Sequence, residues 1–407
     1  MNQNKYLSYV NLYKEKKPVI IYKVDEHYHY YDGTTEHMDK GELKNKINKF
    51  DSGFIVVDCP LCFGCMTEHK DIKECHELFM KDATDIIHYT DGKINFFITG
   101  KTTNTAIKLF FDMNKDLYKE LEEVGYEEAQ WLENATMGAF TYAKKGYEGK
   151  AHKYDFNSRY PSIMNSSMSF PIKKGSFETI DKIESNIQYG IYRCVIQGKH
   201  PCFKYNHLHY YTHTDIDLAK KLGLSVGLIH DEKPNFLSYP SNTNTRKQGR
   251  IMFKEYVEYL YNLRLKYPTK KHIFKQLLNC LWGVLVKKHT KKIKTCSDGE
   301  DFEIFDFSQI ESIEPNADCS KVIFEIVNTK HMYKGAIPRL KPFLISQGRK
   351  KICETISPFF DDVLHVHTDG FCLPYKNEKL KTGSNIGDLK YEGEINLFIK
   401  NINDYKK

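Results

Sequence analysis

Residues 154–162 of the chain read YDFNSRYPS, in which a carboxylate is followed by Asn, Ser and a turn closed by Pro. The residues before this stretch favour a strand, so Asp155 is predicted at a strand end. There a carboxylate oxygen that faces a cleft can bind a hard cation. An ordinary strand-to-helix turn, capped by Asn157 or Ser158, has the same pattern. This stretch alone leaves the two interpretations evenly matched.

A second informative stretch is the helical pattern over residues 270–284. Lys271, Lys275 and Asn279 are spaced four residues apart, so they share one face of the predicted helix. Two ammonium groups and an orienting amide suit the binding of a triphosphate. A solvated basic face is the alternative, but the Trp-Gly pair at residues 282–283 favours binding because it leaves space for a flat base pair beside the backbone.

The third stretch, HTDGF at residues 367–371, has an Asp-Gly turn between two apolar strand patterns. An ordinary hairpin turn has this pattern too, but here the turn would also direct the carboxylate of Asp369 into a cleft. The order of carboxylate, Lys/Asn helix and carboxylate hairpin favours a joint function. Asp155 and Asp369 could hold two Mg²⁺ ions about 3.5–4 Å apart, while the lysines neutralise charge on a leaving pyrophosphate.

These three stretches resemble the motifs of family B DNA polymerases. The resemblance is closest to the protein-primed viral, phage and linear-plasmid branch, of organellar and viral type B, and the chain looks like a truncated member. Residues 155–162 (DFNSRYPS) match D-x-x-S-L-Y-P-S with Arg in place of Leu. Residues 275–283 (KQLLNCLWG) match K-x-x-x-N-S-x-Y-G. Residues 365–370 (HVHTDG) correspond to Y-x-D-T-D-S, with His in place of the first Asp and Gly in place of Ser.

The resemblance implies a role for each matching residue. Asp155 and Asp369 would be the catalytic metal ligands, with the carbonyl oxygen of Phe156 as a third ligand. Tyr160 would lie under the sugar and exclude a 2′-hydroxyl. The full set of implied nucleotide-binding residues is Ser158, Tyr160, Arg264, Lys271, Lys275 and Asn279.

Contacts with DNA are expected outside these motifs. Gly138 and Ala139 lie in TMGAFT, which is similar to the template-contacting Y-x-G-G/A element, and Lys390 lies in DLKYEG, which is similar to L-K-x-E. Basic runs between the second and third motifs favour contacts with duplex phosphates over a merely solvated face. Their members include Lys287, Lys288, Arg339, Lys341, Arg349, Lys350 and Lys351.

The expected fold is α+β. The resemblance implies a right-hand polymerase with a palm of antiparallel sheet plus helices, two-helix fingers, a reduced exonuclease-like N-terminal domain and a largely absent thumb. Only a few tens of residues follow the third motif, which is too few for a full thumb. The predicted domains are residues 1–125 (exonuclease-like), 126–240 (palm with the first motif), 241–284 (fingers hairpin) and 285–407 (palm with the third motif).

The expected function is a template-directed DNA polymerase that adds dNTPs to a primer 3′-hydroxyl. No convincing D-x-E pair precedes the first motif, so proofreading is not expected. Primer–template DNA and dNTPs are the implied partners, with a protein primer or a separate thumb or processivity subunit as additional ones. One alternative is a catalytically impaired, DNA-binding replication accessory protein derived from such a polymerase, which His367 and Gly370 favour. A nuclease that uses Asp51 and Asp58 is another.

Composition limits the remaining choices. The chain has 407 residues, a formal net charge of +7 and 11 cysteines. No run of about 18 apolar residues exists, so neither a transmembrane helix nor a membrane partner is expected. The cysteines indicate reduced thiols in an intracellular protein that is not secreted. Their spacing also fits a Zn²⁺ site, but free thiols are favoured because no second C-x-x-C pair is present. The candidate zinc ligands are Cys59, Cys62, Cys65 and Cys75.

Overall fold

The computed structural model describes most of the chain, and the descriptions below concern those residues. They are residues 15–24, 27–38, 54–57, 72–241, 244–294, 310–315, 322–328 and 331–406. The candidate zinc ligands Cys59, Cys62 and Cys65, and the nuclease candidates Asp51 and Asp58, lie outside them.

The chain divides into two compact units, which are described separately. Unit 1 comprises residues 1–117 and 253–284, and unit 2 comprises residues 118–252 and 285–407. The predicted fingers segment is therefore mostly grouped with the N-terminal part of the chain. The division into exonuclease-like, palm and fingers domains stays a prediction.

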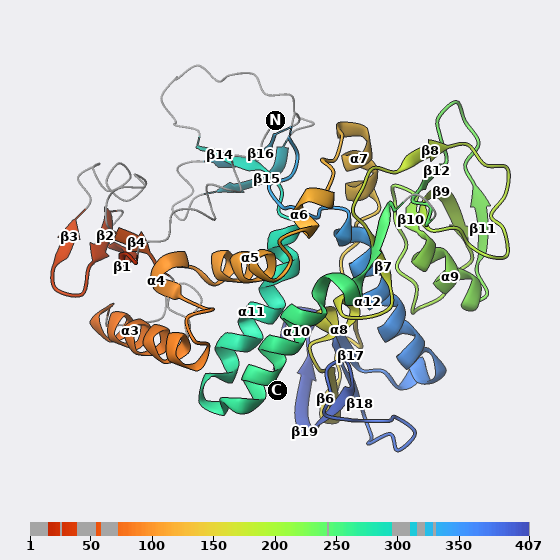
Figure 1. Cartoon of the computed structure of the whole chain (residues 1–407). Coiled ribbons are helices and arrows are strands. Elements are labelled where there is room, and N and C mark those ends of the chain that lie inside the picture. The colour runs from red at the N-terminus through yellow and green to blue at the C-terminus, as the bar shows by residue number, and fades with distance from the viewer. Residues whose placement is uncertain are drawn as a thin grey trace. The chain divides into compact units, whose positions relative to one another are not determined.

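Unit 1 contains a small mixed sheet covered by a helix (Figure 1). Its strand order is β3-β2-β1-β4, with β1 parallel to β4 and the other pairs antiparallel. The long helix α3 (Ile72–Tyr89) contacts β1 and β2, and Phe79 and Ile86 on it are fully buried. The strands are β1 (Lys17–Val24), β2 (His27–Tyr31), β3 (Glu36–Met38) and β4 (Phe54–Val56).

The predicted helical hairpin is confirmed and is formed by α10 (Gly249–Lys266) and α11 (Lys271–Leu285). A 3₁₀ turn at Pro268–Lys270 joins them, because proline cannot continue the first helix. The Tyr256 hydroxyl donates to the carbonyl oxygen of Leu277 at 2.6 Å and ties the helices together. The short helices α4 (Phe96–Thr99) and α5 (Thr102–Met113) also belong to unit 1.

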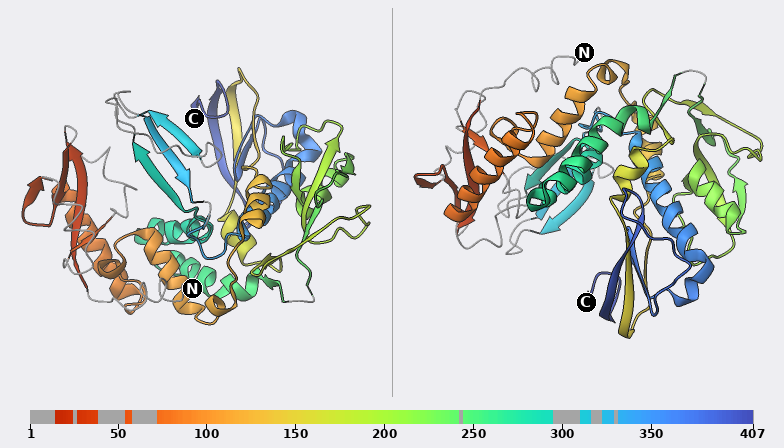
Figure 2. Two further views of the ribbon diagram at one scale, coloured as in Figure 1. Left: turned by 90° about the horizontal axis from the view of Figure 1, so that it is seen from above. Right: turned by 60° about the horizontal axis from the view of Figure 1, so that its bottom comes forward.

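Unit 2 is built around a six-stranded antiparallel sheet with the order β20-β19-β6-β18-β17-β5. Strands from the middle and the end of the chain therefore lie side by side, as Figure 2 shows in yellow and blue. The sheet brings the first and third motifs onto neighbouring strands. The strands are β5 (Thr141–Ala143), β6 (Glu148–Phe156), β17 (His365–His367), β18 (Gly370–Leu373), β19 (Leu389–Ile399) and β20 (Tyr405–Lys406).

One hydrophobic cluster joins this sheet to the helix α12 (Leu340–Ile356). Tyr154 and Phe371 stack at 5.2 Å between ring centroids and pack in the same cluster as Ile352 and Ile356 of α12. The free energy gained by burying these apolar side chains is the main contribution that stabilises the packing of the helix on the sheet. α12 also contacts α7 (Tyr126–Asn134), α8 (Arg159–Met164) and α9 (His213–Lys221).

Further antiparallel strands complete unit 2. A five-stranded sheet has the order β10-β9-β12-β8, with β11 also paired to β9. Its strands are β8 (Ser176–Glu178), β9 (Gly190–Gln197), β10 (Tyr210–Thr212), β11 (Ser225–Leu228) and β12 (Phe236–Ser238). Two smaller sheets remain. One pairs β7 (Ser169–Pro171) with β13 (Arg246–Gln248), and the other has the strand order β14 (Thr290–Lys294), β16 (Val322–Val327) and β15 (Ile310–Pro315).

Two short helices are also present, α6 (Leu117–Glu120) and the 3₁₀ helix η3 (Ser357–Asp362). No helix in the described part of the chain is both long and apolar enough to cross a membrane.

Candidate active site

Asp155 lies near the end of β6, in the middle of the six-stranded sheet. Its neighbours in register are Gly370 on β18 and Lys390 on β19. Paired residues of antiparallel strands direct their side chains to the same face. The side chain of Asp155 therefore lies on the same face of the sheet as that of Lys390, and Gly370 on its other side contributes no side chain there. The carboxylate is partly exposed, as a ligand for an incoming cation has to be.

Asp369 lies in the hairpin turn between β17 and β18, directly before Gly370. Its backbone carbonyl oxygen accepts a hydrogen bond from the N–H of Phe156 at 3.0 Å. The structure thus places the backbone of Asp369, in the turn before β18, next to the end of β6, where Asp155 lies. Phe156, whose carbonyl is the third predicted ligand, directly follows Asp155 and is buried.

The donor set fits Mg²⁺, since the ion prefers hard oxygen ligands and takes one or two carboxylates from a protein. A cation bound to Asp155 needs space beside the carboxylate, and Gly370, which has no side chain, leaves that space. A Cβ atom at Gly370 would lie 2.9 Å from Oδ1 of Asp155 and 3.0 Å from the carbonyl oxygen of Tyr154. The space beside the Asp155 carboxylate is therefore one that even a methyl group would fill.

Ser158 and Tyr160, the predicted nucleotide-binding residues of the first motif, lie at the start of α8. Ser158 is buried and adopts a left-handed backbone conformation, with a φ of 47°. Tyr160 is partly exposed, and its ring lies 5.2 Å from the guanidinium carbon of Arg159. Gly348 on α12 packs against this pair: a Cβ there would lie 3.0 Å from Cε1 of Tyr160.

Besides Arg159, a second positively charged side chain, that of Lys351, contacts the first motif. Its ammonium group donates to the carbonyl oxygen of Gly387 at 2.7 Å and lies 4.8 Å from the centre of the Phe156 ring. Burial lowers the pKa of Lys351, and the nearby Arg159 lowers it further. Lys351 therefore links Gly387, in the segment after β18, to Phe156 of the first motif.

The segment with Gly138 and Ala139 is held by two cations that the sequence did not single out as its partners. Arg349 donates to the carbonyl oxygens of Met137 at 2.8 Å and of Gly138 at 3.2 Å. Lys204 donates to the carbonyl oxygen of Ala139 at 3.1 Å. Gly138 itself is exposed, so a template strand could approach its backbone.

The prediction that residues 339–351 form a phosphate-binding face is wrong for most of its basic members. Arg339 and Arg349 are buried. Each makes an ion pair inside unit 2 at 2.7 Å, Arg339 with Glu128 and Arg349 with Asp215. Lys341 pairs with Glu133 at 2.9 Å, and Lys350 pairs with Asp217 at 2.6 Å. These contacts satisfy the charges internally.

The remaining predicted DNA-binding lysines differ in exposure. Lys287 is exposed, whereas Lys288 makes an ion pair with Glu133 at 2.9 Å. The Lys390 side chain is 56% exposed and lies 3.6 Å from Glu392. Lys287 and Lys390 are therefore accessible to a phosphate, although Lys390, like the less exposed Lys288, already has an acidic partner.

In unit 1, the polar stripe of α11 faces outward. Lys271, Lys275 and Asn279 are exposed, and the opposite face of the helix is buried. Gly283 is exposed as well, and a Cβ there would meet nothing within 4 Å. Arg264, in the last turn of α10, is partly exposed. The predicted triphosphate ligands thus lie on one accessible helix face.

The zinc prediction has no support in the described residues. They contain no group of three or more His, Cys, Asp or Glu residues that could hold a metal ion. Cys75 is fully buried in α3. The other three candidate ligands lie outside the described residues.

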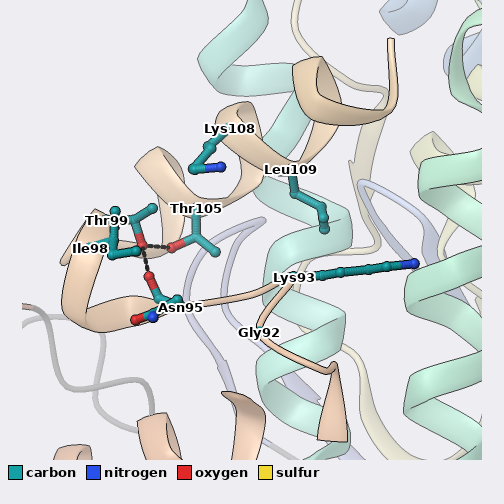
Figure 3. Close-up of a pocket in the computed structure, with 8 residues that line it drawn as sticks. All are labelled: Gly92, Lys93, Asn95, Ile98, Thr99, Thr105, Lys108 and Leu109. Atoms are coloured by element: carbon teal, nitrogen blue, oxygen red, sulfur yellow. Dashed lines mark hydrogen bonds between the residues drawn. The ribbon is translucent and has the colours of Figure 1, made fainter. Parts of the chain in front are cut away.

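Unit 1 also contains a small pocket of about 80 Å³, shown in Figure 3. Several of its polar lining residues already have partners: the Thr99 and Thr105 hydroxyls lie 2.5 Å apart, and Lys108 pairs with Asp112 outside the lining. Lys93 is directed away from these threonines (Figure 3) and lies over the Tyr259 ring. None of the predicted site residues lines this pocket.

The family of organellar and viral type B DNA polymerases matches the chain over residues 68–334. The chain belongs to this family. The matched range contains Asp155 and the stripe of α11, while Asp369 lies beyond it. No curated protein matches the chain in sequence.

Solved structures of the phi29 DNA polymerase share the fold of this type B polymerase chain. The complex with primer–template DNA has a TM-score of 0.60 at 15% identity, over 86% of this chain and 61% of that one. The complex with primer–template DNA and incoming nucleotides has a TM-score of 0.60 at 15% identity, over 93% of this chain and 70% of that one. The chain thus spans about three fifths of the length of the first of these.

Proposed function

We propose that this chain is a template-directed DNA polymerase that adds dNTPs to a primer 3′-hydroxyl by two-metal nucleotidyl transfer. The observation that carries the proposal is a backbone adjacency: Asp155 on β6 pairs with Gly370 of β18, and its neighbour Phe156 donates a hydrogen bond to the carbonyl oxygen of Asp369 in the turn before β18. This adjacency joins residues that are far apart in the sequence, in a chain of the type B polymerase family, and it supports a joint role of the two carboxylates.

In this proposal the chain's own residues bind and orient the reactants. Asp155, Asp369 and the Phe156 carbonyl hold the metal ions. When bound, two Mg²⁺ ions would activate the primer hydroxyl and stabilise charge on the leaving pyrophosphate. Tyr160 lies under the sugar of the incoming nucleotide and rejects a 2′-hydroxyl.

The triphosphate is bound by the exposed stripe of α11 in the same proposal. Lys271 and Lys275 supply positive charge, and Asn279 orients the nucleotide by hydrogen bonds. Ser158 and Arg264 are further nucleotide contacts by resemblance. The DNA contacts proposed for unit 2 are Gly138, Ala139, Lys287, Lys288 and Lys390.

The partners proposed for the chain are primer–template DNA and dNTPs. The phi29 polymerase structures that share its fold were solved with these molecules. A protein primer and a separate thumb or processivity subunit are the additional partners that the resemblance implies. Such a replication activity would operate inside a cell.

A primer-extension assay with a labelled primer and all four dNTPs tests the proposal. Extension that follows the template sequence is expected with Mg²⁺ or Mn²⁺. Asp155→Asn and Asp369→Asn should each reduce the rate by at least about 100-fold, because each removes a carboxylate charge that would hold the Mg²⁺ ions that stabilise the transition state. A mispaired, labelled primer should stay intact without dNTPs, since proofreading is not part of the proposal.

The second candidate is a catalytically impaired, DNA-binding accessory protein. It is favoured by His367, which occupies the position of the first Asp of the third motif and provides no carboxylate there. DNA binding without extension in either metal would support this candidate and would contradict the polymerase.

A further inference from the structure

Arg159 is a charged side chain in the interior of unit 2, at the first position of α8. It is 1% exposed. Nη1 donates to the carbonyl oxygen of Thr368 at 2.7 Å. Nε and Nη2 have no hydrogen-bond partner among the described residues. Among the described residues, the bond to Thr368 is therefore the one hydrogen bond of this buried guanidinium, whose central carbon also lies 5.2 Å from the centre of the Tyr160 ring.

A buried arginine with so few polar contacts lowers the stability of the fold, so we expect the contact that it does make to have a role. A buried charge loses its hydration, and buried donors without partners add to the loss. The motif that this stretch resembles has Leu at this position, and Leu would fill apolar space without either penalty. Packing alone does not account for Arg159. Of its two specific contacts, the one with Tyr160 stays within the first motif, whereas the bond to Thr368 reaches the third.

Thr368 is the residue that needs such a partner. It has a φ of 56°, in the left-handed region that β-branched residues rarely adopt. The peptide between Thr368 and Asp369 therefore belongs to a strained turn. Its oxygen is held by Arg159, and the next oxygen along the chain, that of Asp369, is held by the N–H of Phe156.

Both peptide groups that flank the Cα atom of Asp369 are thus bound by residues of the first motif. We propose that Arg159 is a positioning residue that holds the Thr368–Asp369 turn in its strained conformation and so aims the Asp369 carboxylate for divalent-cation binding. This inference rests on the proposed function, because it takes Asp369 to be a metal ligand. Residues that orient metal ligands typically change metal affinity or activity about 10–100-fold when they are replaced.

Direct Mn²⁺ binding to the full-length chain, followed by electron paramagnetic resonance, tests the inference without measuring catalysis. Arg159→Leu should weaken Mn²⁺ binding by about 10–100-fold. Arg159→Lys keeps a donor and should retain more of the affinity. Adding Thr368→Asn to Arg159→Leu should restore part of it, because Asn adopts the left-handed conformation more readily.

Ile163→Ala, on the buried side of the same helix, is the matched control for lost packing. It should leave the Mn²⁺ affinity within a few-fold of that of the unmodified chain. Amide hydrogen exchange of the peptide containing residues 365–373 should rise in Arg159→Leu more than in this control. Equal loss of Mn²⁺ binding in Arg159→Leu and Ile163→Ala, or no loss in either, would overturn the inference.

The same measurement separates this inference from the proposed function. Mn²⁺ binding that depends on Asp155 and Asp369 and is weakened by Arg159→Leu, in a chain that does not extend primers, would support the positioning role and contradict the polymerase. Mn²⁺ binding that is unchanged in Asp369→Asn would overturn the positioning role, whether or not primers are extended.

Discussion

Gly370 lies opposite Asp155 in the register of β18 and β6, so closely that a Cβ atom on Gly370 would lie 2.9 Å from Oδ1 of Asp155. The corresponding motif position is Ser in the polymerases that this chain resembles. In this chain a serine would displace the Asp155 carboxylate or push β18 away from the Tyr154 carbonyl, which is 3.0 Å from the same point.

Gly370→Ser is therefore expected to reduce primer extension rather than improve it. A displacement of about 1 Å at a reacting centre can lower the rate about 100-fold, so we expect a loss of about 10- to 100-fold in kcat. Gly227→Ser on β11 is the control, because a Cβ there meets nothing within 4 Å. Full activity of Gly370→Ser would show that the Asp155 carboxylate does not need the space beside it.

Gly348 should matter for sugar selectivity. Replacing a helical glycine by alanine normally stabilises a helix by about 1 kcal/mol. At Gly348 the new Cβ would lie 2.8 Å from Nη2 of Arg159 and 3.0 Å from Cε1 of Tyr160. Gly348→Ala is expected to lower the melting temperature and to move the Tyr160 ring.

The measurement that checks this is the ratio of kcat/KM for a dNTP to that for the matching NTP. The ratio should fall in Gly348→Ala and in Tyr160→Ala, because both alter the ring proposed to exclude the 2′-hydroxyl. An unchanged ratio together with a higher melting temperature would contradict the packing argument.

Lys275 is expected to contribute to nucleotide binding. Hydrogen bonds to charged groups contribute about 1.5–3 kcal/mol, so Lys275→Ala should raise the KM for dNTPs about 10-fold or more. Lys275→Arg keeps the charge and should have a smaller effect. Steady-state primer extension at varied dNTP concentration measures both.

Lys254, which is exposed on α10, provides the matched control for the loss of a surface charge. Lys254→Ala should leave the dNTP KM unchanged. A rise of similar size in both variants would mean that net charge, rather than the stripe on α11, sets the affinity for nucleotides.

Local patterns explain how much of this arrangement the sequence could predict. The α11 stripe followed from four-residue spacing, and its exposure is now seen for Lys271, Lys275 and Asn279. The Asp-Gly turn predicted the β17–β18 hairpin. Such features depend on neighbours along the chain, which a single sequence contains.

Long-range charge pairing is what the sequence did not reveal. Arg349 looked like part of a surface charge run, but Asp215, far away in the sequence, neutralises it inside unit 2. Arg159 looked like a tolerated substitution for Leu. A signal was present there, because a position where the motif has Leu is expected to be buried, and an arginine at such a position needs a specific partner.

His213 should make the stability of the chain depend on pH. Its imidazole is partly buried, with a ring-centroid distance of 4.0 Å to Tyr189, and the buried Nδ1 has no hydrogen-bond partner among the described residues. Burial lowers the pKa of His213 to about 3. An unfolded chain has a histidine pKa of about 6.5, so between these values the unfolded state binds more protons than the folded state. The free energy of unfolding should therefore fall as the pH decreases from about 6.5 towards 3.

Replacing His213 by phenylalanine should remove this contribution, because phenylalanine keeps the aromatic packing and does not titrate. We expect His213→Phe to be more stable than the unmodified chain at pH 5 and to show a shallower pH dependence. Urea unfolding at pH 5 and pH 7.5 measures the difference. Equal pH dependence in the two proteins would mean that other groups, such as the buried carboxylates, control acid unfolding.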